Sequence, residues 1–255
     1  MPVRMMKCLN LRQGETIMKT TVKPCPIRTM AGGVGLLSLM AMGLSLPHTA
    51  SAAPAKAPTA SSKVMLSKNA ATLFALGEGG ENVYDAAKVG NWKTAASKTA
   101  GLEKAARILP PRWKAMANQF RLASSLGKLR AAVQGHQKGE AMHQANRVTL
   151  FAARLSRDSA PRVPVEVTLL DVYGRDLEIG ALRGDRVYLA RAQRDLAATW
   201  ARIRAAVVAR GGKRQARTFS ALVARVEAAS LPSQFTQLAT PILDKVDNLE
   251  KVFEK

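Results

Sequence analysis

The sequence has few of the residues on which most covalent and metal chemistry depends. It holds two cysteines and three histidines among 255 residues, and aromatic residues make up 5% of it. Both cysteines, Cys8 and Cys25, lie in an amino-terminal segment that we expect to be removed. Removal leaves no thiol for a disulfide, a metal or a nucleophile, and no Cys-x-x-Cys-His motif for a c-type haem. The sequence also contains no Gly-x-Ser-x-Gly nucleophile motif and no phosphate-binding-loop motif.

The amino-terminal residues have the pattern of a secretory signal. From Met18 the chain has a basic start, an apolar segment over 30–46 and the small-residue run Ala50-Ser51-Ala52. We therefore expect residues 1–52 to be a cleaved signal peptide, with Met18 as an alternative start, and a destination in the periplasm or outside the cell. The apolar segment is shorter than the roughly 20 residues of a membrane-spanning helix, so we expect no transmembrane span after cleavage; an uncleaved anchor is the alternative. Arg28 stands alone, which favours the general secretory route over the twin-arginine route.

Positive charge dominates the rest of the chain. The full sequence has 39 basic and 18 acidic residues; residues 1–52 hold six and one of these, which leaves 33 and 17 and a net charge of +16. Such a field raises encounter rates with polyanions without selecting one of them. Outside the cytoplasm these partners are anionic lipids and acidic envelope polymers, whereas export and the scarcity of aromatic residues argue against nucleic acid. Solubility in a generally basic proteome is the alternative explanation.

The composition and periodicity predict an all-α fold. Residues 53–63 are rich in Pro, Ala and Ser and predict a flexible tether, followed by a single domain over 64–255. Within that domain apolar residues recur every three or four positions, good helix formers dominate, and no Asn-Gly or Asp-Gly hairpin signal separates apolar runs. We expect an up-and-down antiparallel helical bundle, in which the longest helices can form a four-helix core. A helical-repeat superhelix is the alternative.

Several helix ends are marked by residues with distinctive backbone chemistry. Asn91 is the expected N-cap of a helix that Pro110-Pro111 ends. One helix is then expected over 112–134, and Gly211-Gly212 is a strong carboxyl-terminal stop for a long helix further on. We expect the last helix to begin where Thr240 caps Pro241 in a first turn.

The stretch 163–180, VPVEVTLLDVYGRDLEIG, fits two secondary structures. Alternation over 163–169 suggests a strand with one buried face. As a helix, the segment has Pro164 in its first turn, where the missing N–H costs nothing, and Glu166 near the positive end of the helix dipole. The helical stripe extends through the whole segment while the alternation stops at Leu170, so we expect a helix.

This expected helix carries a candidate ligand site. Spacings of four and three bring Asp171, Arg175 and Glu178 to one flank, with Tyr173 nearby. A solvated ion pair worth about 0.3–0.5 kcal/mol is the simpler interpretation. The functional alternative makes Arg175 a carboxylate or phosphate clamp held by Asp171, which requires the flank to face a cavity.

A glycine on the apolar stripe of the same helix leaves room for a close neighbour. Gly174 predicts the near approach of a second helix, and Gly77 and Gly80 on the first helix of the domain are candidates for that contact. A flat ligand in the gap is the alternative.

Histidine provides the one candidate metal site. In a helical arrangement His136, Glu140 and His143 would share a face at a spacing that lets imidazoles and a carboxylate bind one divalent ion. The glycines at 135 and 139 predict a turn around His136, which would break this alignment. A polar turn between helices is therefore the alternative, and no other cofactor is expected.

The most basic region surrounds Gly211. We expect an anionic lipid, an envelope polymer or a protein partner to bind a surface formed by the following residues: Arg202, Arg210, Lys213, Arg214 and Arg217.

Three segments resemble a group of exported bacterial helical-bundle proteins that have no established activity. They are ANRVTLFAARL at 145–155, PVEVTLLDVYGRDLEIG at 164–180 and LATPILDKVDNLEKVF at 238–253. The resemblance implies export and a bundle, and it transfers no catalytic residue.

Three functions follow as hypotheses. The first is a non-catalytic exported protein whose basic surface binds an anionic envelope ligand or a protein partner. The second is a bundle that binds a metal or a small molecule. The third is an envelope lyase or hydrolase, which is disfavoured because no acid, base and nucleophile occur together at helical spacing.

Overall fold

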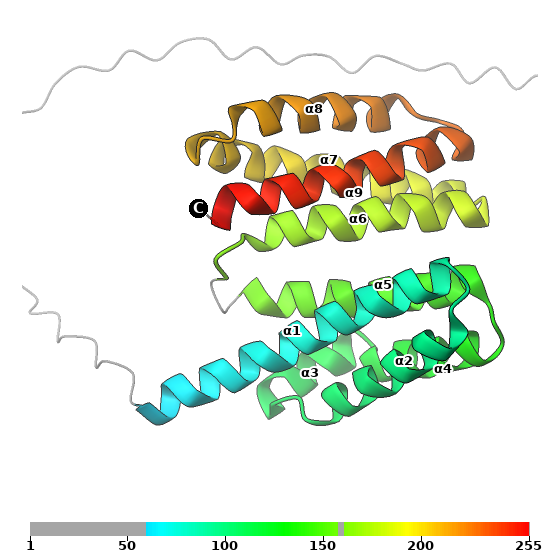
Figure 1. The fold of residues 1–255 in the computed structure, drawn as a ribbon, viewed down its shortest axis with the longest axis vertical. Helices are drawn as coiled ribbons and strands as arrows, with labels where there is room; N and C mark the ends of the chain where they lie inside the picture. Colours follow the sequence, from blue (N-terminus) through cyan, green and yellow to red (C-terminus); the bar gives the residue numbers. More distant parts are fainter. Residues whose placement is uncertain (1–59, 158–160, 255) are drawn as a thin grey trace, which may run out of the picture. The chain divides into compact units, whose positions relative to one another are not determined.

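The computed structural model describes residues 60–157 and 161–254. The expected signal peptide, both cysteines and residues 53–59 of the expected tether lie outside this part of the chain. All described residues belong to one compact unit, Ala55–Lys255. They form helices and no strand (Figure 1), so the prediction of an all-α fold is confirmed, and 165–169 is helical. No helix among them combines the length and apolar character needed to cross a membrane.

The described helices follow one another through short connections. Five come before the gap at 158–160: α1 (Ala60–Lys88), α2 (Trp92–Arg107), α3 (Pro111–Gln119), α4 (Leu122–Gln134) and α5 (Lys138–Ser156). Four come after it: α6 (Val165–Arg183), α7 (Arg186–Ala209), α8 (Lys213–Ala228) and α9 (Pro232–Glu254).

The buried apolar side chains form two clusters rather than one. Helices α1 to α5 enclose the first cluster, in which Leu76, Leu102 and Phe151 are almost fully buried. Helices α6 to α9 lie side by side (Figure 1) and enclose the second, which includes Leu196 and Phe219. Burial of each side chain of this size contributes about 1.5–3 kcal/mol to the stability of the fold. The bundle is therefore two half-bundles, each with its own core.

Helix α6 belongs to both halves. Most of its buried residues pack in the second cluster, but Ile179 packs in the first. Polar contacts add to this connection, because Asn146 on α5 donates a hydrogen bond of 2.9 Å from Nδ2 to the carbonyl oxygen of Val172 on α6. The polar residues that were predicted on 171–178 lie along this boundary.

Most of the marked helix ends occur where they were predicted. The Asn91 side chain accepts a 3.1 Å hydrogen bond from the backbone N–H of Thr94 and caps α2. Pro111 occupies the first turn of α3. Gly211 has a φ of 85° just after α7, a conformation that glycine adopts without a steric penalty.

Three predicted helix boundaries differ from the structure. The single helix expected over 112–134 is broken into α3 and α4, because Arg121 has a φ of 54°. The last helix does not begin at Pro241; α9 starts at Pro232, and Pro241 lies inside it. The side chain of Gln234 accepts hydrogen bonds from two backbone N–H groups ahead of α9, so this earlier start is stabilised. Helix α1 begins at Ala60 and so includes residues that were assigned to the tether.

Gly174 and Gly80 each allow a close contact between helices, although they do not meet each other as was expected. Gly174 packs against α9, where an added Cβ would lie 2.9 Å from Leu243 and 3.0 Å from Ile242. Gly80 instead packs against α5, and an added Cβ would overlap Thr149 there. The prediction that Gly174 meets a neighbouring helix is correct, but that helix is α9 and not α1.

Candidate functional site

The predicted flank of α6 is largely buried. Arg175 is 8% exposed, and its Nη2 lies 2.9 Å from Oδ2 of Asp171. Its Nη1 lies 3.4 Å from Oε1 of Glu81 on α1, and its guanidinium stacks over the ring of Tyr84 at 5.3 Å from the centroid. Burial raises the pKa of Asp171 to about 7; Arg175 opposes the rise and Glu81 adds to it. The guanidinium therefore clamps two carboxylates of its own chain.

Glu178 completes the connection between α1 and α6. Its Oε2 accepts hydrogen bonds from the hydroxyl of Tyr84 at 2.7 Å and from Nζ of Lys88 at 2.9 Å. Burial, and then the nearby Glu178 carboxylate, raise the pKa of Tyr84, so the phenol stays protonated and donates this bond. Asp171, Arg175 and Glu178 together form a polar seam that joins α1 to α6.

The fourth residue of that predicted site, Tyr173, lines a different cleft, between α5, α6 and α7. The cleft has a volume of about 70 Å³ and contains a hydrogen-bonded chain of side chains. The hydroxyl of Tyr188 donates to Oδ1 of Asp176 at 2.5 Å, and Nδ2 of Asn146 donates to the same oxygen at 2.6 Å. Nδ1 of His143 lies 3.1 Å from the Tyr188 hydroxyl oxygen.

Burial determines the protonation of this chain. It raises the pKa of Asp176 to about 6, while the hydrogen bonds from Tyr188 and Asn146 limit the rise. It lowers the pKa of His143, as does the positive charge of Arg183. The neutral imidazole and the hydrogen-bonded carboxylate stabilise the packing of three helices. A space of this size holds little more than one or two water molecules, so this chain of residues supports the fold.

Neither Asp176 nor Tyr188 was singled out in the sequence. Tyr188 comes three residues after Asp185, whose side chain caps α7 by accepting from the Tyr188 N–H. The sequence did contain a signal for this contact: Tyr188 lies in the first turn of α7, and Asp176 lies on the preceding helix, α6.

The three predicted metal ligands have separate partners. His136 has a φ of 53° in the turn before α5 and stacks on Trp92, with ring centroids 4.9 Å apart. Glu140 pairs with Arg183 at 3.5 Å, and His143 contacts Tyr188 as described above. Within 60–157 and 161–254, no group of three or more acidic, histidine or cysteine side chains is arranged to hold a metal ion.

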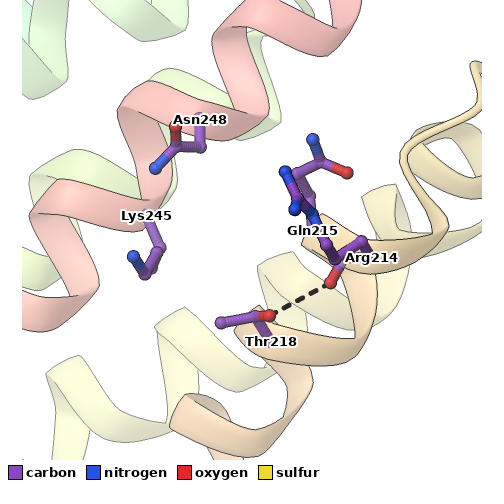
Figure 2. Close-up of a pocket in the computed structure, with 5 residues that line it drawn as sticks. All are labelled: Arg214, Gln215, Thr218, Lys245 and Asn248. Atoms are coloured by element: carbon purple, nitrogen blue, oxygen red, sulfur yellow. Dashed lines mark hydrogen bonds between the residues drawn. The ribbon is translucent and has the colours of Figure 1, made fainter.

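A basic groove lies between α8 and α9. Its volume is about 350 Å³. Figure 2 shows Arg214, Gln215 and Thr218 on α8 facing Lys245 and Asn248 on α9. The Thr218 hydroxyl donates to the Arg214 carbonyl oxygen at 3.1 Å, which leaves its lone pairs for a further donor. In the described part of the chain neither Arg214 nor Lys245 makes an ion pair.

The five residues of the predicted anion-binding surface are spread along α7, α8 and the turn between them. Arg214 lines the groove, and Lys213 and Arg217 are exposed on the same helix. Arg210 lies over the ring of Phe253, 5.9 Å from its centroid, and Arg202 donates to Oγ1 of Thr199 at 2.8 Å.

Sequence reasoning missed the contribution of α9 to this groove. Lys245 and Asn248 are three positions apart and therefore share a face of α9, beside the buried Val246 and Leu249. That spacing was visible in the sequence, but the pairing of this face with Arg214 depends on how the two helices pack.

Comparison with models of protein families, with curated proteins and with solved structures finds no match for this chain.

Proposed function

We propose that this protein is a non-catalytic exported protein that binds the phosphate group of an anionic envelope lipid in the groove between α8 and α9. The observation that supports this proposal is the pair of cations in the groove, Arg214 and Lys245, which lie on different helices and have no acidic partner among the described residues.

The composition of the groove suits a phosphate. A guanidinium offers a planar fork of donors to two phosphate oxygens, and an ammonium adds a point charge. Gln215 and Asn248 supply neutral amide donors, whereas the Thr218 hydroxyl proton is already donated to the Arg214 carbonyl oxygen. The net charge that remains after removal of residues 1–52, +16, would attract such a ligand from a distance.

Export is part of the same proposal. Residues 1–52 have the basic, apolar and small-residue regions of a signal peptide, and the periplasm or cell exterior brings the basic surface to lipid headgroups. Mass measurement of the protein isolated from its own cells checks this part, since a mature chain beginning near Ala53 is expected.

Vesicle binding tests the groove directly. We expect the protein to be retained on phosphatidylglycerol vesicles and to be released by salt, because screening shortens the range of the field from about 10 Å at 0.1 M to about 3 Å at 1 M. Replacing both Arg214 and Lys245 by Gln should weaken retention by about a hundredfold or more, given about 1.5–3 kcal/mol for each of two charged hydrogen bonds.

A matched control distinguishes the effect of the groove on vesicle binding from the effect of the overall charge. Replacing Lys98 and Lys104 by Gln removes the same two charges from exposed positions on α2, so retention should change little. Glycerol phosphate added in solution distinguishes a free phosphate from a membrane: if it competes at low millimolar concentration, a soluble ligand replaces the lipid in this proposal. Equal retention on phosphatidylcholine, or equal losses in the two double variants, would refute it.

A further inference from the structure

A second groove, far larger than the cleft beside Asp176, lies between α2, α3 and α4. Its volume is about 590 Å³, within the range of roughly 300–1,000 Å³ typical of small-molecule sites. Its floor is aliphatic and includes Leu109, Leu122 and Leu126, with Ala117 as part of the wall. These leucines are almost buried, at 3%, 4% and 6% exposed, so they are held rigidly by the core beneath them.

The break between α3 and α4 creates this shape. Arg121 takes a left-handed conformation, so α3 does not continue the axis of α4. Residues from both helices then line the same groove opposite α2. The left-handed conformation of Arg121 therefore breaks the helix that was predicted over 112–134, and it also opens the groove.

Positive charge without a partner lies at the rim. Arg107 on α2 and Lys114 on α3 line the groove, are exposed, and make no ion pair within the described residues. Glu103 and Arg130 also line it, but Arg130 donates from Nε to Oε1 of Glu103 at 2.7 Å, so their charges compensate one another. The uncompensated charge of the groove is positive.

One part of the groove is open enough to be filled. Gly127 on α4 lines it, and a Cβ added there would meet nothing within 4 Å. Gly101 on α2 is equally open but does not line the groove. The chain thus offers a blocking position and a matched control of the same residue type, both inside helices.

We propose that this groove binds a long-chain fatty acid. The alkyl chain lies along the leucine and alanine floor, where its burial is favourable, and the carboxylate pairs with Arg107 and Lys114. A fatty acid has one alkyl chain and one negative charge. It therefore matches a groove that has one apolar floor and a cationic rim. The site lies on helices other than α8 and α9, so it does not rest on the function proposed above.

Palmitate titration of the whole chain tests this inference. We expect saturable binding of one palmitate per chain by calorimetry, and weaker binding of hexadecanol, which has the same chain without the charge. Gly127→Leu should weaken palmitate binding by about tenfold or more, because the leucine occupies the space of the alkyl chain, whereas Gly101→Leu should leave it unchanged. Circular dichroism of both variants should match the wild type, since each replaces an unobstructed helical glycine.

The charged rim has its own pair of variants. Arg107→Gln with Lys114→Gln should weaken palmitate binding by about tenfold and bring it close to that of hexadecanol, while Lys98→Gln with Lys104→Gln should have no effect. Absence of saturable palmitate binding to the wild type, or equal binding by the folded Gly127→Leu variant, would overturn the assignment. Tighter binding of lysophosphatidylglycerol than of palmitate would also overturn it, because the ligand would then be a phospholipid.

Discussion

Replacement of Arg175 by Met is the sharpest test of how the two half-bundles are joined. The substitution keeps the aliphatic length of the side chain and removes the guanidinium from between Asp171 and Glu81. The Asp171 side chain is 15% exposed, so water cannot replace the lost partner. Removing one member of a buried pair costs about 3–5 kcal/mol of unfolding free energy. That is a large part of the roughly 5–15 kcal/mol that stabilises a typical domain.

The loss of unfolding free energy in Arg175→Met should depend on pH in a defined direction. The pKa of Asp171 is about 7 in the folded protein and 3.8 as a free side chain, so the folded state holds this proton more tightly. Stability from this group therefore falls as pH rises from 4 to 7. Without Arg175 the pKa of Asp171 rises further, so we expect the variant to lose more stability at pH 8 than at pH 5, where Asp171 is neutral in both proteins.

Urea unfolding followed by circular dichroism at pH 5 and pH 8 measures both effects. Adding Asp171→Asn to Arg175→Met should return the unfolding free energy to within about 1–2 kcal/mol of the wild type, because the carboxylate that then lacks a partner, Glu81, has a side chain that is 29% exposed to water. Arg191→Met is the matched control: it breaks the exposed pair with Asp195, which has the same four-residue spacing, and it should cost under about 1 kcal/mol. A loss of less than 1 kcal/mol for Arg175→Met at pH 8 would show that this pair behaves like a solvated surface pair and would refute the reasoning.

Three further predictions concern single positions, each checked by urea unfolding. Gly80→Ala should cost about 1–3 kcal/mol because its Cβ overlaps Thr149, while Gly77→Ala should be neutral or stabilising, and equal effects would contradict this packing. Arg121→Gly should raise the unfolding free energy by about 0.5–1 kcal/mol, because glycine adopts the left-handed conformation without strain. A lower unfolding free energy would show that this φ carries no strain. The folded pKa of Asp176, about 6 against 3.8, makes the wild type lose about 2 kcal/mol of unfolding free energy between pH 4 and 6.5, so Asp176→Asn should gain that amount relative to it as pH rises; a constant difference would refute the shift.

The helical class and several helix ends could be predicted because they depend on neighbouring residues. Asn91 caps and Gly211 ends a helix through local backbone chemistry, wherever the helix lies in the fold. Arg121 could not be predicted to break a helix, since arginine favours the right-handed conformation and no glycine or proline marks the turn. Pro241 was expected to begin a helix because it is unfavourable inside one, yet the buried residues on either side of it hold α9 together.

The candidate sites show a similar limit. The positive charge of α8 could be read from its density of arginines, whereas the contribution of Lys245 depends on the packing of α9 beside it. In the same way, Asp171 and Arg175 were correctly placed on one flank, but an exposed pair and a buried pair have the same spacing. The Asp171–Arg175 pair is buried because Arg175 packs against Glu81 and Tyr84 of α1, which are about ninety residues away in the chain.

The polar seam along α6 bears on how the chain is assembled during synthesis. Helices α1 to α5 are made first, and each half-bundle closes its own apolar interior with residues that are near one another in sequence. The surfaces that remain for the later meeting of the halves carry Glu81 on one side and Asp171, Arg175 and Glu178 on the other. Such surfaces are well hydrated before they meet. Part of the boundary on a half-finished chain is therefore polar rather than apolar, which lowers the risk of aggregation while the second half is still being made.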